Sequence, residues 1–321
     1  MAALSDNVLI TITVLAYLVA MLLHSADYAF GRQSHIAKAA VRERELVGAG
    51  GPPVVEKAGG FLIGQEIKPR AKLSMLQIAL GATVLAGAAH LATVVTRALA
   101  AERMPWGNMY EFVLTVTLLG TLVWLAVAIV KPEVRHLGLF VVLVQVLLTG
   151  VAQIVLQKPI GPLVPALDSY WFVIHVASVA TASALFLVGF AASLMYLLRS
   201  GYDKGKRGGL YPYGRLFANA ETVERLSFRM HAFAFPIWTF GVTAGAIWAE
   251  AAWGRYWGWD PKETWAFISW IVYAGYLHAR ATPSISRRAA AWIAVIGWAT
   301  MLMNLFGVNI FFEGLHSYGG V

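Results

Sequence analysis

The sequence predicts an all-α integral membrane protein, a polytopic bundle of about eight transmembrane helices with both termini outside. Composition is the first reason: the 321 residues are 59% hydrophobic and 13% charged, with a mean hydropathy of +0.65, whereas soluble domains carry about 25% charged residues. The second reason is that the apolar residues form runs long enough to span a bilayer. The third is the uneven distribution of basic residues between these runs. We expect a single membrane domain over residues 1–321.

The apolar runs define the expected spans in chain order. Each run matches or exceeds the roughly 20 residues that a helix needs to cross the hydrocarbon core. The expected transmembrane helices are residues 8–30, 73–97, 106–130, 137–156, 168–198, 230–252, 262–280 and 289–312. In the sixth, Gly241 and Gly245 form a face of small residues that favours close helix packing.

The connectors between the spans predict the orientation. Residues 32–72 and 199–229 are basic and contain several glycines, so both are expected to be loops. Twenty of the 25 Lys and Arg residues fall on the side of these two loops, which are therefore predicted to be cytoplasmic, with residues 253–265 external. Basic cytoplasmic loops also explain the net charge of +8 better than binding to nucleic acid does. The chain has no cysteine, which excludes thiolate ligands within it.

Residues 253–265, which read WGRYWGWDPKETW, are the most distinctive segment. Asp260 suits an N-cap, Pro261 the first helical position and Glu263 the reciprocal cap, so a helix is expected to begin here. An aromatic belt at the headgroups is a simpler interpretation, but a belt does not need Gly254 and Gly258 between the rings. We interpret the segment as a platform for a large, flat, apolar ligand. Its tryptophans are Trp253, Trp257, Trp259 and Trp265.

Haem matches such a platform, because haem requires a flat apolar slot, axial ligands and partners for its propionates. His175 begins the fifth span and His316 follows the eighth, both on the predicted outer side. These two histidines could provide axial nitrogens from opposite sides of the ligand. Arg255 and Lys262 are candidate propionate partners.

The segment resembles the tryptophan-rich WWD signature of haem-handling membrane proteins. The continuation DPKE points to the CcsA/ResC family (also called CcsB) of System II cytochrome c maturation. Further matches are NMYE at 108–111, YLHAR at 276–280, GVN at 307–309 and GLHSY at 314–318. The resemblance is most specific from residue 171 to the C-terminus and weaker over the first hundred residues.

The resemblance implies a protein of the bacterial cell membrane that handles haem b and acts with a ResB-type membrane partner as a cytochrome c haem lyase or synthase. His175 and His316 match two external histidines that ligate the haem iron, and His278 matches a membrane histidine that holds haem on its way out. The family attributes a second membrane ligand to the partner, and His24 is left open as an alternative. For His90 and His231 a packed, hydrogen-bonded role is favoured.

The implied reaction joins haem to apocytochrome c. The thiols of a CxxCH segment add to the haem vinyl groups, and its histidine displaces one axial ligand. Trp257, Trp259 and Asp260 are expected to act with His175 and His316 in this step, and the four tryptophans of the segment to contact haem.

Other functions remain open at this stage. The chain could be a System I-like haem handler, although DPKE argues against it, a transporter that exports haem without ligating it, or a structural scaffold for ResB. Formation of cytochrome c with only this chain and ResB supplied would separate these alternatives.

Overall fold

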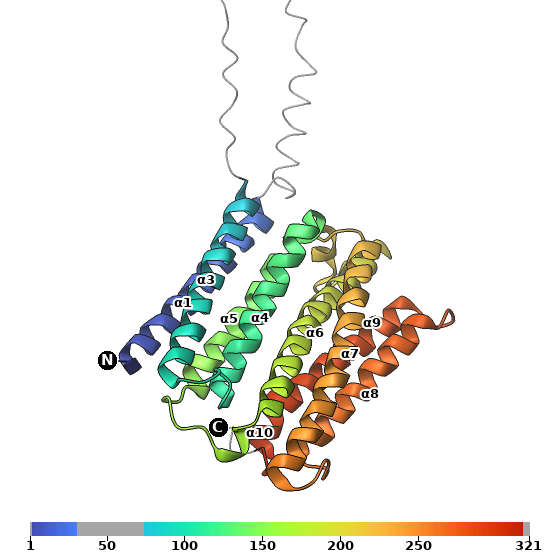
Figure 1. The fold of residues 1–321 in the computed structure, drawn as a ribbon. Helices are drawn as coiled ribbons and strands as arrows, with labels where there is room; N and C mark the ends of the chain where they lie inside the picture. The colour runs from blue at the N-terminus through green and yellow to red at the C-terminus, as the bar shows by residue number, and fades with distance from the viewer. Residues whose placement is uncertain (1, 31–73, 317–321) are drawn as a thin grey trace, which may run out of the picture.

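The long helices of the protein run side by side in one bundle (Figure 1). The computed structural model describes residues 2–30 and 74–316, and within these ranges there is no strand. The predicted all-α fold is therefore confirmed. The long helices are α1 (Ala2–Phe30), α3 (Met75–Ala101), α4 (Met109–Val130), α5 (Gly138–Val151), α6 (Tyr170–Asp203), α7 (Ala220–Trp253), α8 (Pro261–Ala281) and α9 (Arg287–Leu302).

Short irregular elements complete the bundle. Helix α5 continues as the π-helical η2 (Ala152–Leu156), and α9 continues through the π-helical η5 (Met303–Gly307) into α10 (Val308–Phe311). The 3₁₀ elements η1 (Pro132–Leu137), η3 (Pro165–Leu167) and η4 (Tyr211–Leu216) lie in connectors.

Seven helical segments in the described residues are long and apolar enough to cross a membrane. Helix α8 is not among them, although it lies beside α7 and α9 in the bundle (Figure 1). Its apolar residues are interrupted by Lys262, Glu263, His278 and Arg280. A helix with this many ionisable groups is unusual in a membrane, where such groups mark functional sites.

The second predicted basic loop is shorter than residues 199–229. Helix α6 continues to Asp203, and α7 begins at Ala220 behind the N-cap Asn219. The charged residues that suggested loop instead extend both helices past the apolar runs, with an Arg199–Asp203 ion pair at i,i+4 spacing. The first predicted loop, residues 32–72, lies outside the described residues.

The connectors between the helices lie at two opposite ends of the bundle (Figure 1). Connectors 102–108, 157–169 and 254–260 lie at the end that also carries the N-terminus of α1 and the C-terminal residues; we call this the aromatic end. Connectors 131–137, 204–219 and 282–286 lie at the opposite, basic end. The helices thus alternate in direction as the sequence predicts.

Candidate functional site

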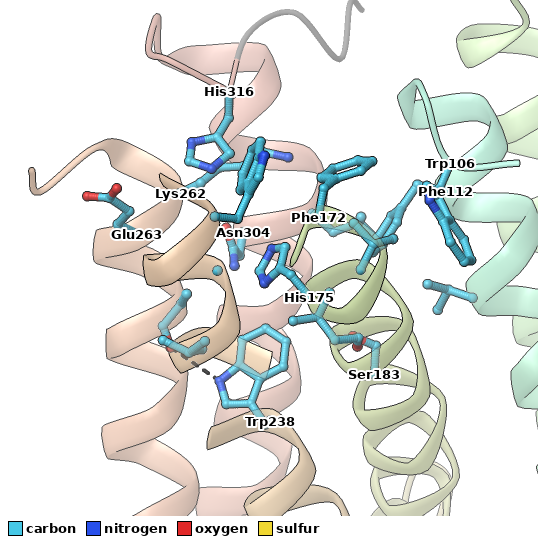
Figure 2. Close-up of a pocket in the computed structure, with 18 of the residues that line it drawn as sticks. Trp106, Phe112, Phe172, His175, Ser183, Trp238, Lys262, Glu263, Asn304 and His316 are labelled. Carbon is cyan, nitrogen blue, oxygen red and sulfur yellow. Dashed lines mark hydrogen bonds between the residues drawn. The ribbon is translucent and has the colours of Figure 1, made fainter. Parts of the chain in front are cut away.

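A cavity opens at the aromatic end among α4, α6, α7, α8, η5 and the C-terminal residues, and it encloses about 190 Å³. Its wall is almost entirely aromatic and aliphatic, which suits a flat apolar ligand. Figure 2 shows His175 and His316 directed into this space from different elements. The aromatic residues of the wall are Trp106, Phe112, Phe172, Trp238, Trp248, Tyr256, Trp257 and Trp298.

His175 lies in the second turn of α6, and its orientation is set by α7. Its Nδ1 is 2.7 Å from the carbonyl oxygen of Gly241, so Nδ1–H donates and the lone pair of the neutral ring lies on Nε2. Gly245 lets α7 approach, because a Cβ there would lie 2.6 Å from the imidazole. The small-residue face predicted at Gly241 and Gly245 therefore forms the seat of His175.

His316 is held by the residue that caps α8. Asp260 is the N-cap of that helix, and its Oδ1 accepts from His316 Nδ1 at 2.8 Å. The other carboxylate oxygen accepts from the backbone N–H of Leu315 at 2.7 Å. Gly314 permits this contact, because a Cβ there would lie 2.5 Å from Asp260 Oδ2. The same carboxylate therefore caps α8 and holds His316 in position.

The Asp260 carboxylate is a stable acceptor in this arrangement. Burial alone would raise its pKa, but the hydrogen bond and charge of His316 and the N–H groups of Leu315 and Lys262 lower the pKa below its ordinary value. Glu263 completes the reciprocal cap by accepting from the backbone N–H of Asp260 at 3.0 Å and of Gly258 at 2.9 Å.

Trp248 is the residue that links the two histidines, and it was not predicted, because it lies inside an apolar span. Its indole stacks on His175 with centroids 5.9 Å apart and meets His316 edge-on, also at 5.9 Å. Its N–H donates to the carbonyl of Ala166 at 2.8 Å. Spacing along α7 could have indicated it, because Trp248 precedes Trp253 by five residues and so shares its end of the helix.

The tryptophans of residues 253–265 do not all face the cavity. Trp257 lines it, and Trp253 contacts the His316 ring edge-on at 4.9 Å from outside the wall. Trp259 is 64% exposed, with a φ of 57°, and Trp265 lies in α8 away from the lining. Of the predicted platform of four rings, only Trp257 thus lies in the wall, and Trp253 reaches the site through His316. The positive φ of Trp259 sets the direction of that exposed ring, and Trp265 follows the helix cap within α8. Most of the aromatic wall comes instead from other elements.

Of the two predicted propionate partners, only Lys262 lies at the cavity. Lys262 is the one Lys or Arg among the described residues of the wall, and its Nζ lies 3.8 Å from the Met109 sulfur. An ammonium beside a weak thioether acceptor can attract an anionic group. Arg255 is exposed and folds back over Gly258 instead.

The remaining described histidines lie elsewhere. His278 is exposed on α8 near the basic end. His24 is buried, with Nε2 3.0 Å from Thr83 Oγ1, and His90 is buried against the Tyr17 hydroxyl at 3.1 Å. His231 is buried, with Nδ1 2.7 Å from the carbonyl oxygen of Ser227. These partners agree with the packed role expected for His90 and His231.

Comparison with known proteins identifies the family of this fold and site. The Cytochrome C assembly protein family matches residues 106–316, which include His175, Asp260 and His316. The cytochrome c biogenesis protein CcsA of Guillardia theta is 33% identical over 77% of this chain and 87% of its own length. The chain belongs to the CcsA family. Its function therefore lies in cytochrome c biogenesis.

Other CcsA proteins agree with this assignment, and one solved structure shares the fold. CcsA of Gloeobacter violaceus is 30% identical over 76% of this chain and 86% of its own length. CcsA of Prochlorococcus marinus is 40% identical over 50% of this chain and 58% of its own length. The solved structure of cytochrome c haem lyase CcmF superposes with a TM-score of 0.58 at 17% identity, covering 95% of this chain and 47% of CcmF. This chain spans about half the length of CcmF, and the likeness extends to the fold alone.

Proposed function

We propose that this CcsA-family protein binds haem b between His175 and His316 at the aromatic end and presents it for covalent attachment to apocytochrome c. One observation carries the proposal. Two imidazoles from distant parts of the chain meet at one apolar cavity, and each is fixed through Nδ1, by a carbonyl at 2.7 Å and by a carboxylate at 2.8 Å. Imidazoles fixed in this way offer Nε2 to a metal.

The chemistry of the cavity fits haem. Its aromatic wall suits the porphyrin faces, and Lys262 suits a propionate. The enclosed volume of about 190 Å³ is smaller than the roughly 300–1,000 Å³ of common ligand pockets. We therefore expect one edge of the haem to stay outside the wall, where a peptide can reach it.

Haem attachment requires positioning more than acid–base chemistry. Each cysteine thiol of a CxxCH segment adds across one vinyl double bond, with sulfur bonded to one carbon and the proton to the other. No oxidant is consumed and no group leaves. The residues of this chain would hold the iron and exclude water, and the histidine of the CxxCH segment would replace one of the two axial histidines.

His278 supports a second, inner haem site shared with a ResB-type partner. It points away from the bundle on α8, on the face that also exposes Ile271 and Phe267. An ionisable side chain on a lipid-facing surface is costly, so a covering partner is expected. His24 is not a suitable second ligand, because it is buried on α1, at the opposite side of the bundle from α8 (Figure 1).

We further propose that the aromatic end faces the outside of a bacterial cell membrane. The basic end carries most of the Lys and Arg residues in the described connectors, among them Lys131, Lys204, Lys206, Arg207 and Arg215. Basic connectors are retained on the cytoplasmic side. Haem would then enter from the inner side and react on the outer side.

The test is reconstitution in a bacterium that lacks its own cytochrome c maturation system. This chain is supplied with a ResB-type partner and a reporter apocytochrome containing one CxxCH segment. We expect covalent c-type haem on the reporter when both proteins are present, and none with His175→Gly or His316→Gly. Haem accumulation outside the cytoplasm without attachment would instead favour the transport function.

A further inference from the structure

We propose that Asp260 is a positioning residue that makes His316 the stronger of the two axial donors. The inference rests on the proposed haem function and concerns how the two ligands differ. Asp260 Oδ1 lies 2.8 Å from His316 Nδ1, whereas His175 Nδ1 bonds a neutral backbone carbonyl, that of Gly241, at 2.7 Å.

A carboxylate and a carbonyl affect a ligating imidazole differently. A carboxylate that accepts from Nδ1–H increases electron density on the ring and raises the basicity of Nε2. A stronger, more anionic donor favours ferric over ferrous iron and so lowers the reduction potential. A carbonyl fixes the same tautomer with a smaller effect. The structure thus assigns unequal strength to two ligands of identical type.

Asp260 is suited to this task because its other contacts hold it rigid. It accepts from the backbone N–H of Leu315 at 2.7 Å and of Lys262 at 3.0 Å. The Glu263 side chain secures its backbone N–H at 3.0 Å. Its side chain is 3% exposed, so water competes little for its oxygens. The carboxylate that orients His316 therefore has no freedom to turn away.

The unequal strength of the two ligands predicts which histidine leaves the iron first. The histidine of an incoming CxxCH segment would displace the weaker donor, His175, while His316 keeps its hold on the iron. Asp260 would then act through His316 and need not touch haem itself.

The test compares the reduction potentials of the haem-loaded full chain, purified with its partner, as wild type, Asp260→Asn and Glu263→Gln. Asparagine is as good an N-cap as aspartate, so Asp260→Asn removes the carboxylate while keeping the cap. Glu263→Gln removes a neighbouring carboxylate but keeps a side-chain oxygen that can accept at the cap, and it does not touch His316, so it is the matched control. We expect Asp260→Asn to lose about 10-fold in ferric affinity, which for one electron corresponds to an upward shift of about 59 mV. Glu263→Gln should match wild type.

The outcomes separate this inference from the proposed function. Equal potentials in Asp260→Asn and wild type, or equal shifts in both variants, would overturn the role of Asp260. Loss of haem in Asp260→Asn alone, with recovery on adding imidazole, would support it, because His316 would have been lost as a ligand while the helix cap was kept. Absence of a two-histidine haem spectrum in wild type would overturn the proposed function itself.

Discussion

Two pairs of histidines, one in each half of the bundle, lie in different surroundings. In the half formed by α1, α3 and the adjacent helices α4 and α5, His24 and His90 are inside the packing, and each meets a hydroxyl group, on Thr83 and Tyr17. In the half formed by α6 to α9, His175 and His316 stand at the wall of a cavity, with a carbonyl and a carboxylate behind them.

The surroundings of a membrane histidine, more than its residue type, therefore decide its role. A hydroxyl beside a ring in a filled interior satisfies a polar group and fastens helices together. A backbone or carboxylate oxygen behind a ring at an open space fixes a tautomer and leaves the opposite edge for a ligand. Variants at both kinds of position test this contrast.

The largest effect is expected in the half formed by α1, α3, α4 and α5. Glu111 at the start of α4 is buried, with Oε1 3.0 Å from Arg97 Nε and Oε2 2.7 Å from Arg103 Nη1. Glu111→Gln leaves buried arginine charge without its anion, which should cost about 3–5 kcal/mol of the free energy of unfolding. The control is Glu221→Gln, which breaks the exposed pair with Arg225 and should cost less than about 0.5 kcal/mol. Denaturation in detergent measures both, and equal losses would contradict the prediction.

The next effect is at the seat of His175. Gly245→Ala would place a Cβ 2.6 Å from the His175 imidazole and force it to move. We expect a cost of about 1–3 kcal/mol in stability, as for overpacked cores, together with weaker haem binding. Gly275→Ala on α8 meets nothing within 4 Å and should leave haem binding unchanged. A haem affinity like that of wild type in Gly245→Ala would show that His175 does not need this seat.

A smaller effect is expected for the cationic side chain at the cavity. Lys262→Met should reduce haem affinity about 10-fold, or about 1.4 kcal/mol, because a propionate would lose its partner. Arg255→Met is the matched control, since Arg255 is exposed and outside the wall. Haem titration of both variants decides the point. A larger loss of haem affinity in Arg255→Met than in Lys262→Met would show that Arg255, in the exposed loop, contacts the propionate.

The packed half should tolerate the loss of a histidine without losing haem. His24→Leu removes the hydrogen bond to Thr83 and should cost about 1–2 kcal/mol of stability. Thr83→Val, which removes the other partner, should have a similar effect. The haem spectrum should be unchanged in both. A spectral component lost only in His24→Leu would make His24 a ligand.

The smallest effect is expected when the pH is lowered. The folded pKa of Asp260 is lowered, so its contribution to stability is fully present above the ordinary aspartate value of about 3.9 and is lost as pH falls through the lower folded value. Hydrogen-exchange protection of the Leu315 amide, which bonds Asp260, should therefore be constant between about pH 7 and pH 5. A loss of protection in that range would show that the carboxylate is not held as described.

Sequence reasoning reached the helical fold and much of the candidate site, for physical reasons. Runs of apolar residues follow directly from bilayer thickness, and Asp260 as a helix cap follows from local chemistry. Helix ends were missed where charged residues extend a helix beyond the membrane core, as at Asp203 and Ala220.

The wall of the cavity was harder to foresee. Trp248 and Trp238 occur in apolar spans, where a tryptophan facing a cavity and one facing lipid look the same in the sequence. Trp259 was expected at the site, but its position depends on one residue of backbone with positive φ. Contacts between distant elements, such as Asp260 with His316, carry no local pattern.

Ligation of haem by His175 and His316 is tested most directly by an absorption spectrum of the purified protein, co-expressed with a ResB-type partner, beside His175→Gly and His316→Gly. We expect a reduced six-coordinate haem b spectrum in wild type, its loss in either variant, and its recovery when imidazole is added. The same spectrum in all three samples would show that haem is held by histidines away from this cavity.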